Sequence, residues 1–337
     1  MGKKIIRVIA VVLIPVVCLY LLTLLLTPKY VNDIPEGSMI AEYYKSEKNN
    51  DVLILGDCEV YENISTVTMW ENYGISSYIR GSAEQLIWQS YYLLEDTLKY
   101  EKPQVVIVNV LAMTESDAKS EAYNRMTLDG MKLSKYKIAS VRESMTEEEN
   151  MASYIFPLLR YHSRWSELSS EDFRYMWKTP SVTTNGYLMQ KGVRPVTTIP
   201  KAAPLANYTF SDRNMEYLDK IYSLCKDNGI NLVLMKAPSV YPHWYDEWDK
   251  QVSDYAYEHG ILYLNTINEA GNIGIDYTTD TFDYGQHLNV EGAEKLSLYL
   301  GEQLVKNFRL TDHRQDESYK NAWQSIVNKY YEEKQGD

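Results

Sequence analysis

Short runs of continuous apolar residues alternate with amphipathic stretches along most of the chain. The apolar runs span residues 52–55, 105–110, 232–235 and 261–264. Runs that are apolar at every position, and not at every second one, are typical of strands buried on both faces of a sheet. The stretches beside them place apolar residues at helical spacing, over residues 87–98, 215–225 and 293–304. This alternation predicts a three-layer α/β domain, with a mostly parallel sheet between two layers of helices.

The N-terminal segment has a different pattern. Residues 5–27 are almost wholly apolar, and as a helix they would span about 35 Å, which is enough to cross a bilayer. Lys3, Lys4 and Arg7 precede the run, so the excess of positive charge predicts a cytoplasmic N-terminus and an extracytoplasmic main domain. A cleaved signal peptide is the alternative, but no small-x-small cleavage site follows the run. We therefore expect residues 1–30 to be a membrane anchor that meets the lipid bilayer through residues 5–27.

The other segments complete the expected organisation. Residues 31–50 are polar and contain proline and glycine, as is typical of a linker. The α/β domain would span residues 51–310, and residues 311–337 would close the chain with a helix. Residues 114–212 interrupt the alternation and are too many for a plain crossover between two strands. We expect this segment to be an insertion or a cap over the sheet that contributes to substrate selection.

Composition narrows the classes of function. The net charge is −12, and the first 30 residues carry basic side chains without acidic ones, so the main domain should repel nucleic acid. The 30 tyrosines outnumber the 5 phenylalanines. Tyrosine suits membrane interfaces and carbohydrate grooves, although compositional drift explains the number equally well. Neither the 3 cysteines nor the 5 histidines have metal-ligand spacing, so we expect no metal and no cofactor.

Candidate catalytic residues lie beside two of the predicted elements, one after the first strand and the other before the last helical stretch. The stretch LGDCE ends the first strand and places Cys58 at the edge of the sheet where parallel α/β proteins bind ligands. The later stretch DYGQHLN places Asp283 four residues before His287, and Asn289 there is a suitable N-cap for the next helix. A carboxylate at that spacing can hold one imidazole nitrogen while the other accepts a proton from a nucleophile. The pattern predicts a nucleophilic cysteine, a histidine base and an orienting aspartate.

Other roles for these residues stay open. A free cysteine is most often a small buried hydrophobe, as we expect for Cys225 on its apolar helical stripe. Cys58 instead lies beyond a strand end between two acidic residues, which would raise its thiol pKa unless His287 or backbone N–H groups offset them. We expect no disulfide between the two cysteines, because the edges of a five-residue strand lie about 17 Å apart. Cys58 could also be vestigial, His287 an ordinary loop histidine, or the thiol a redox sensor, which would need a resolving partner.

The two motifs together resemble those of the SGNH/GDSL hydrolase superfamily. In that family a strand ends in Gly-Asp-Ser or Gly-Ser-Ser, and a late Asp-x-x-His precedes a helix. The N-terminal anchor, the glutamate after Cys58 and the His-Leu-Asn order are most similar to the membrane-anchored branch. That branch includes the D-alanyl-lipoteichoic acid transfer and alginate O-acetylation proteins. The resemblance covers about residues 51–113 and 213–306, and leaves the insertion unexplained.

The resemblance has consequences for fold, function and partners. It implies a flavodoxin-like sheet and an acyl-ester hydrolase or O-acyltransferase. The substrate would be a cell-surface polysaccharide or acyl carrier, and a membrane O-acyltransferase would be the partner. It also implies donors for the developing oxyanion, whose approximate matches are Gly81 or Ser82 and Asn109. The backbone N–H of Cys58 would be a further donor.

The chain departs from the family pattern in more than one place. Cys58 stands where serine is usual, and Tyr284 occupies the usual position of the acid because Asp283 lies one residue earlier. A thiol is intrinsically more nucleophilic than a hydroxyl, so the first departure is compatible with catalysis. A bulge in the loop could absorb the second. The alternative is a non-catalytic subunit of the same fold that binds glycan or a membrane O-acyltransferase.

Overall fold

A five-stranded parallel sheet lies at the centre of the computed structural model, which describes residues 2–28, 36–199 and 201–336. The strand order is β2-β1-β3-β4-β5, the flavodoxin-like order, so the predicted parallel α/β sheet is confirmed. The strands are β1 (Val52–Gly56), β2 (Ser77–Gly81), β3 (Val105–Asn109), β4 (Asn231–Lys236) and β5 (Leu262–Asn265).

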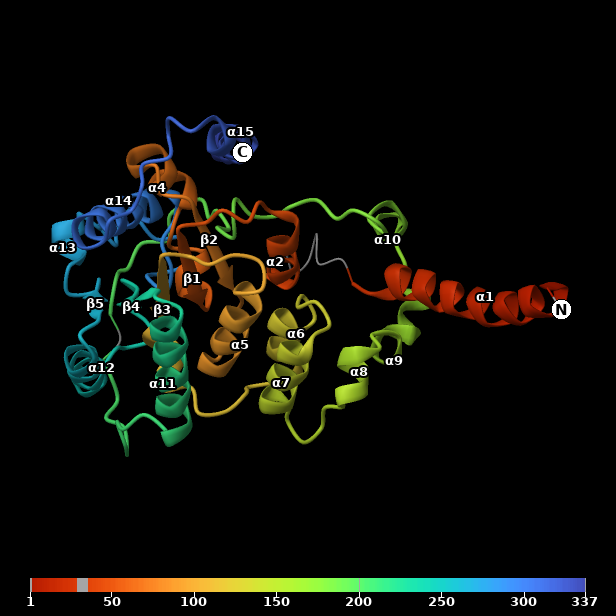
Figure 1. Cartoon of the computed structure of the whole chain (residues 1–337). Helices are drawn as coiled ribbons and strands as arrows, with labels where there is room; N and C mark the ends of the chain where they lie inside the picture. Colours follow the sequence, from red (N-terminus) through yellow and green to blue (C-terminus); the bar gives the residue numbers. More distant parts are fainter. Residues whose placement is uncertain (1, 29–35, 200, 337) are drawn as a thin grey trace.

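Helices cover both faces of the sheet, and successive residues of a strand face opposite cores (Figure 1). Val52 and Ile54 face the core that includes α4 (Thr66–Tyr73), α14 (Val290–Asn307) and α15 (Glu317–Gln335). Leu53 and Leu55 face the core that includes α5 (Ile87–Thr97), α11 (Asp212–Asp227) and α12 (Asp246–His259). Burial on both faces explains why the apolar runs predicted from the sequence are continuous.

Four of the five strands coincide with predicted apolar runs, but the edge strand β2 does not. Its Arg80 interrupts the apolar pattern and yet is only 1% exposed. The guanidinium pairs with Asp96 of α5 at 3.2 Å and donates to the Leu93 carbonyl oxygen at 2.9 Å. A buried charge is tolerated only with such partners, and their presence is not evident from the local sequence.

Different parts of the insertion at residues 114–212 pack against different parts of the α/β domain. Its helices are α6 (Glu121–Leu128), α7 (Lys135–Ser144), α8 (Met151–Ile155), α9 (Leu158–Tyr161) and α10 (Ser170–Arg174). Helix α6 packs against α2 (Glu36–Glu42), and α7 packs against α5. Further along, Asn185 accepts a hydrogen bond from the N–H of Ile79 in β2, and residues 194–196 pair with the loop before His287. Among the described residues of the insertion, those that follow β3 and those around residues 188–196 lie near the predicted site.

The terminal segments differ in how they match expectation. Residues 5–27 lie in or directly after helix α1 (Gly2–Leu26), but among the described residues no helix is both long and apolar enough to cross a membrane. The predicted transmembrane helix is therefore not confirmed. Of the expected linker, residues 31–35 lie outside the described residues. The remaining residues of the expected linker include α2 and the 3-10 helix η1 (Tyr43–Lys45). The apolar side chains of Met39 and Tyr43 in this otherwise polar stretch are buried against the domain. The predicted C-terminal helix is confirmed as α15.

Candidate active site

The turn after β1 explains the GDC sequence. A Cβ atom at Gly56 would lie 2.8 Å from the Cβ of Asn109, so only glycine allows β1 and β3 to approach so closely here. Asp57 is the N-cap of the short helix α3 (Cys58–Tyr61) and accepts a hydrogen bond from the N–H of Glu59 at 3.1 Å. Cys58 is thus the first residue of α3, at the point where the strand order reverses between β1 and β3. Ligands of this fold bind at such a switch point.

Cys58 and His287 line the same cavity. Its volume is about 120 Å³, and the Cys58 side chain is partly exposed. Segments that follow β1, β3 and β4 meet there with the loop before α14. The lining residues are Asp57, Cys58, Glu59, Glu84, Leu111, Glu115, Lys119, Tyr241, Pro242, Gln286 and His287. Cys225, by contrast, is buried on α11, and all 3 cysteines are free.

The loop before α14 joins His287 to Asp283. The imidazole Nδ1 lies 2.6 Å from Asp283 Oδ2, and the His287 backbone N–H donates to Asp283 Oδ1 at 2.8 Å. Tyr284 and Gly285 between them have φ values of 66° and 90°. Two successive left-handed residues fold the loop back, so a carboxylate four residues earlier still reaches the ring. The remaining ring nitrogen, Nε2, is the one that can exchange a proton with a nucleophile.

Sequence reasoning missed Glu62 as a second carboxylate beside this imidazole. Glu62 Oε2 lies 3.2 Å from Nδ1 of His287, and Gln190 from the insertion donates to Glu62 Oε1 at 2.6 Å. Burial lowers the pKa of His287, but the hydrogen bond to Asp283 and the charge of Glu62 outweigh it and raise that pKa to about 9. The imidazole is therefore protonated at neutral pH. Glu62 lies one helical turn after Cys58, and that spacing was the available signal.

The surroundings of Cys58 favour the neutral thiol. Burial raises its pKa well above the ordinary value, and the charges of Asp57 and Glu62 raise it further. Burial and the adjacent Glu59 likewise raise the pKa of Asp57 to about 7. In the described part of the chain, no hydrogen bond to the Cys58 sulfur is found. The resting site is therefore a thiol and an imidazolium, and a proton must leave it before the sulfur can attack.

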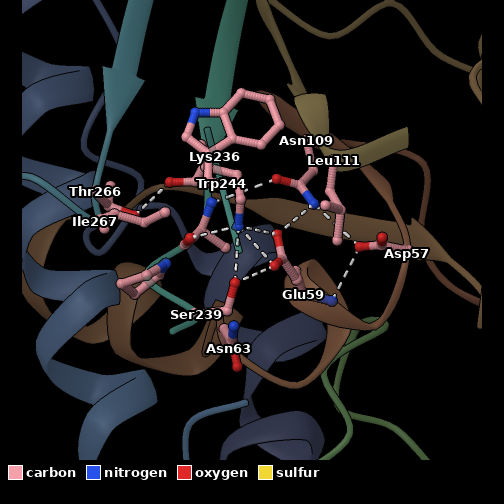
Figure 2. A network of polar contacts seen from close by, with 12 residues as sticks. Asp57, Glu59, Asn63, Asn109, Leu111, Lys236, Ser239, Trp244, Thr266 and Ile267 are labelled. Carbon is pink, nitrogen blue, oxygen red and sulfur yellow. Dashed lines mark hydrogen bonds and ion pairs between the residues drawn. The ribbon is translucent and has the colours of Figure 1, made fainter. Parts of the chain in front are cut away.

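A buried polar network includes Asp57 and Glu59, the residues on either side of Cys58 (Figure 2). Lys236 of β4 donates to both carboxylate oxygens of Glu59 at 2.6 and 2.8 Å, and Ser239 also donates to this carboxylate. Lys236 and Glu59 have side-chain exposures of 0% and 1%. Asn109 Nδ2 donates to Asp57 Oδ1 and to Glu59 Oε2, at 3.0 Å each. The network fixes the first turn of α3 and thereby the backbone of Cys58.

This network changes the expected role of Asn109. Both amide hydrogens of its side chain are directed to carboxylates, so the side chain has none left for an oxyanion. The other expected donors also lie elsewhere. Ser82 donates its N–H to the Gly56 carbonyl oxygen at 3.3 Å, and neither Gly81 nor Ser82 lines the cavity. These expected oxyanion donors are therefore not brought together, because the closely packed strand ends use their polar groups among themselves.

Comparison with known proteins adds a distant structural likeness. No family model and no curated protein matches the chain. A crystal structure of a Bacteroides fragilis protein described as an acylhydrolase is 13% identical, with a TM-score of 0.38 over 82% of this chain and 96% of that chain. A GDSL-like lipase from Bacteroides thetaiotaomicron is 11% identical, with a TM-score of 0.39 over 80% of this chain and 100% of that chain. Likenesses at this level establish neither a family nor an activity.

Proposed function

We propose that the chain is an SGNH-type acyl-ester hydrolase or O-acyltransferase in which Cys58 is the nucleophile. One observation carries this proposal: Cys58 and His287 line one cavity at the strand-order switch point, and Asp283 holds the imidazole at 2.6 Å. A nucleophile, a base and a group that orients the base are the parts that acyl transfer requires. The raised pKa of His287 sets the condition that the imidazole must first lose a proton.

The proposed reaction proceeds through a thioester. Cys58 Sγ bonds to the acyl carbonyl carbon, and its proton passes to Nε2 of His287. The bond from that carbon to the alcohol oxygen then breaks, and His287 returns the proton to the leaving alkoxide. Water or a second hydroxyl attacks the thioester with His287 as base, which restores the thiol and releases an acid or a new ester. The backbone N–H of Cys58 remains as the expected oxyanion donor.

The cellular setting of this reaction follows from the resemblance. We propose an extracytoplasmic main domain on a membrane-attached chain, with a cell-surface polysaccharide or acyl carrier as substrate. A membrane O-acyltransferase would supply or accept the acyl group. The excess of Lys and Arg before residues 5–27 supports this orientation.

The second candidate is a non-catalytic subunit that binds glycan or the membrane O-acyltransferase. The electrostatics of the cavity favour it, because burial and the neighbouring carboxylates keep the Cys58 thiol protonated. The engagement of Asn109 with two carboxylates favours it as well. In this case Cys58 would be a remnant of a reactive position.

Acylation of the protein separates the two candidates. The full chain is incubated with an activated acyl ester at pH 9, and peptide mapping by mass spectrometry locates any added acyl group. We expect a thioester on Cys58, none at that position in Cys58→Ala, and an oxygen ester in Cys58→Ser. Cys225→Ala is the matched control and should still acylate at Cys58, since Cys225 is buried on α11. Equal labelling of wild type and His287→Gln would contradict the enzymatic proposal.

A further inference from the structure

Large apolar side chains are exposed on one part of the insertion. Over residues 156–177, five of them have exposed fractions between 58% and 73%: Phe156, Leu159, Trp165, Phe173 and Trp177. We call these five residues the collar. Of the other tryptophans, Trp248 is partly buried and the rest are buried, for example Trp88 and Trp323 at 0% and 1%. A concentration of exposed aromatic side chains marks a surface that meets a partner.

The collar lies against the end of α1. Helices α9 and α10 and the intervening turn η3 (His162–Ser166) all contact α1, and Figure 1 shows them beside the end of α1 that faces the domain. Arg164 donates to the Leu26 carbonyl oxygen at 2.6 Å, which satisfies an unpaired group in the last turn of the helix. The rings of Tyr20 and Trp177 lie 6.5 Å apart. The collar is thus continuous with the surface of α1.

The adjoining surface of α1 is apolar on all sides. Exposed fractions reach 71% at Val11, 61% at Val12, 56% at Leu13 and 61% at Ile14, four successive positions that point in different directions around the helix. A helix that is hydrophobic all round is suited to a lipid or protein interior and not to water. The collar and α1 should therefore share one apolar environment.

The chemistry of the collar identifies this environment as a lipid surface. Tryptophan and tyrosine concentrate at the headgroup level of bilayers, and arginine and lysine extend to lipid phosphates. Arg174 and Lys178 are exposed within or directly beside the collar. Arg160 is exposed as well but pairs with Glu121 at 3.0 Å, and Glu167 is an exposed carboxylate of the same stretch. A phospholipid bilayer offers both a phosphate layer for such cations and an apolar layer for the exposed rings.

We propose that the collar rests on the headgroup layer of a phospholipid bilayer around the end of α1. This contact gives the inserted residues 156–177 a function of their own, which is to set the height and the orientation of the α/β domain above the lipid. The proposal requires only that α1 and the collar face the same lipid surface. It rests on the membrane attachment proposed above and does not depend on the proposed acyl-transfer reaction.

Tryptophan quenching tests this contact in the full chain. The protein is reconstituted with vesicles of phosphatidylcholine and phosphatidylglycerol, with and without bromine on the lipid acyl chains. We expect the bromolipids to quench the fluorescence, and the double variant Trp165→Phe, Trp177→Phe to lose about half or more of that quenching, because interfacial tryptophans lie near the acyl chains. The matched control Trp248→Phe, in the α12 layer, should keep it.

Fluorescence quenching by aqueous iodide tells whether lipid, water or a second copy of the chain covers the collar. If the collar is on lipid, vesicles protect Trp165 and Trp177 from iodide while bromolipids quench them. If iodide quenches both tryptophans equally with and without vesicles, the collar lies in water and the proposal is wrong. If neither iodide nor bromolipid reaches them, a second copy of the chain covers the collar, which also overturns the proposal.

Discussion

At the residue scale, proton occupancy decides whether Cys58 can react. Asp283 and Glu62 both face Nδ1 of His287, so two carboxylates stabilise the imidazolium. Glu62 also contributes to the raised pKa of the Cys58 thiol. An imidazole that keeps its proton cannot accept another from the thiol. The arrangement therefore places the reactive form of the site above neutral pH.

The pH dependence of acylation follows from this arrangement. Because the pKa of His287 is raised to about 9, the neutral imidazole increases as pH rises toward 9, and the rate of Cys58 acylation should rise with it. Glu62→Gln removes one of the two charges that stabilise the imidazolium, so the rise in acylation rate should occur at lower pH. Stopped-flow acylation with an activated ester between about pH 6 and 10 measures how the rate rises with pH in the wild type and in Glu62→Gln.

The control for that measurement is Glu115→Gln. Glu115 lines the same cavity but pairs with Lys119 at 3.3 Å and not with His287. The acylation rate of Glu115→Gln should rise over the same pH range as that of the wild type. A wild-type rise centred near the ordinary histidine pKa of about 6.5 would show that the two carboxylates do not hold the proton.

At the element scale, the loop before α14 depends on Gly285. Its φ of 90° is in the left-handed region, and a Cβ there would lie 2.3 Å from Val240 Cγ2 and 2.6 Å from Val196 Cγ2. The loop is therefore held between the segment after β4 and the insertion. This close approach positions Asp283 and His287 relative to each other.

Gly285→Ala should disturb the site more than it disturbs the fold. Backbone strain at such a position costs about 1–3 kcal/mol, and the additional clash should displace His287 and slow acylation of Cys58. Gly274→Ala is the matched control, because Gly274 has a φ of 81° but nothing within 4 Å of the added Cβ. Urea unfolding and acylation rates are measured for both variants. Equal losses of acylation rate would show that the close contact at Gly285 does not position the imidazole.

At the scale of the whole molecule, the buried site couples stability to pH. The folded-state pKa of His287 is raised to about 9 from 6.5, so its contribution is complete below pH 6.5 and is lost as pH rises through 9. The contribution amounts to about 3 kcal/mol at most. Asp57, whose pKa is raised to about 7, acts in the same direction, because its protonated form is the one that folding favours.

We therefore expect the free energy of unfolding to fall between pH 6.5 and pH 9, the two pKa values of His287. Urea unfolding at a series of pH values measures this slope. His287→Gln should reduce it, whereas His162→Gln, at an exposed position of η3, should leave it unchanged. An unchanged slope in His287→Gln would show that another group carries the dependence.

The sequence by itself determined the class of fold and the location of the candidate chemistry. Continuous apolar runs and helical stripes are local patterns, and strands buried on both faces produce them whatever the neighbours are. A motif that directly follows a strand must lie at the carboxyl edge of the sheet, so the position of Cys58 there followed from chain order alone. His287 lies in the loop before α14, well beyond β5, and only the folded loop brings it into the same cavity.

Only the tertiary structure decided how the polar groups are used. The edge strand β2 depends on the ion pair of Arg80 with Asp96, and the amide of Asn109 is engaged by Asp57 and Glu59. Each of these contacts joins residues that are distant in the chain, and a buried polar group takes whichever partner packing brings within reach. The local sequence carries no record of that choice, which is why the sequence did not predict β2 or the engagement of the Asn109 amide by two carboxylates.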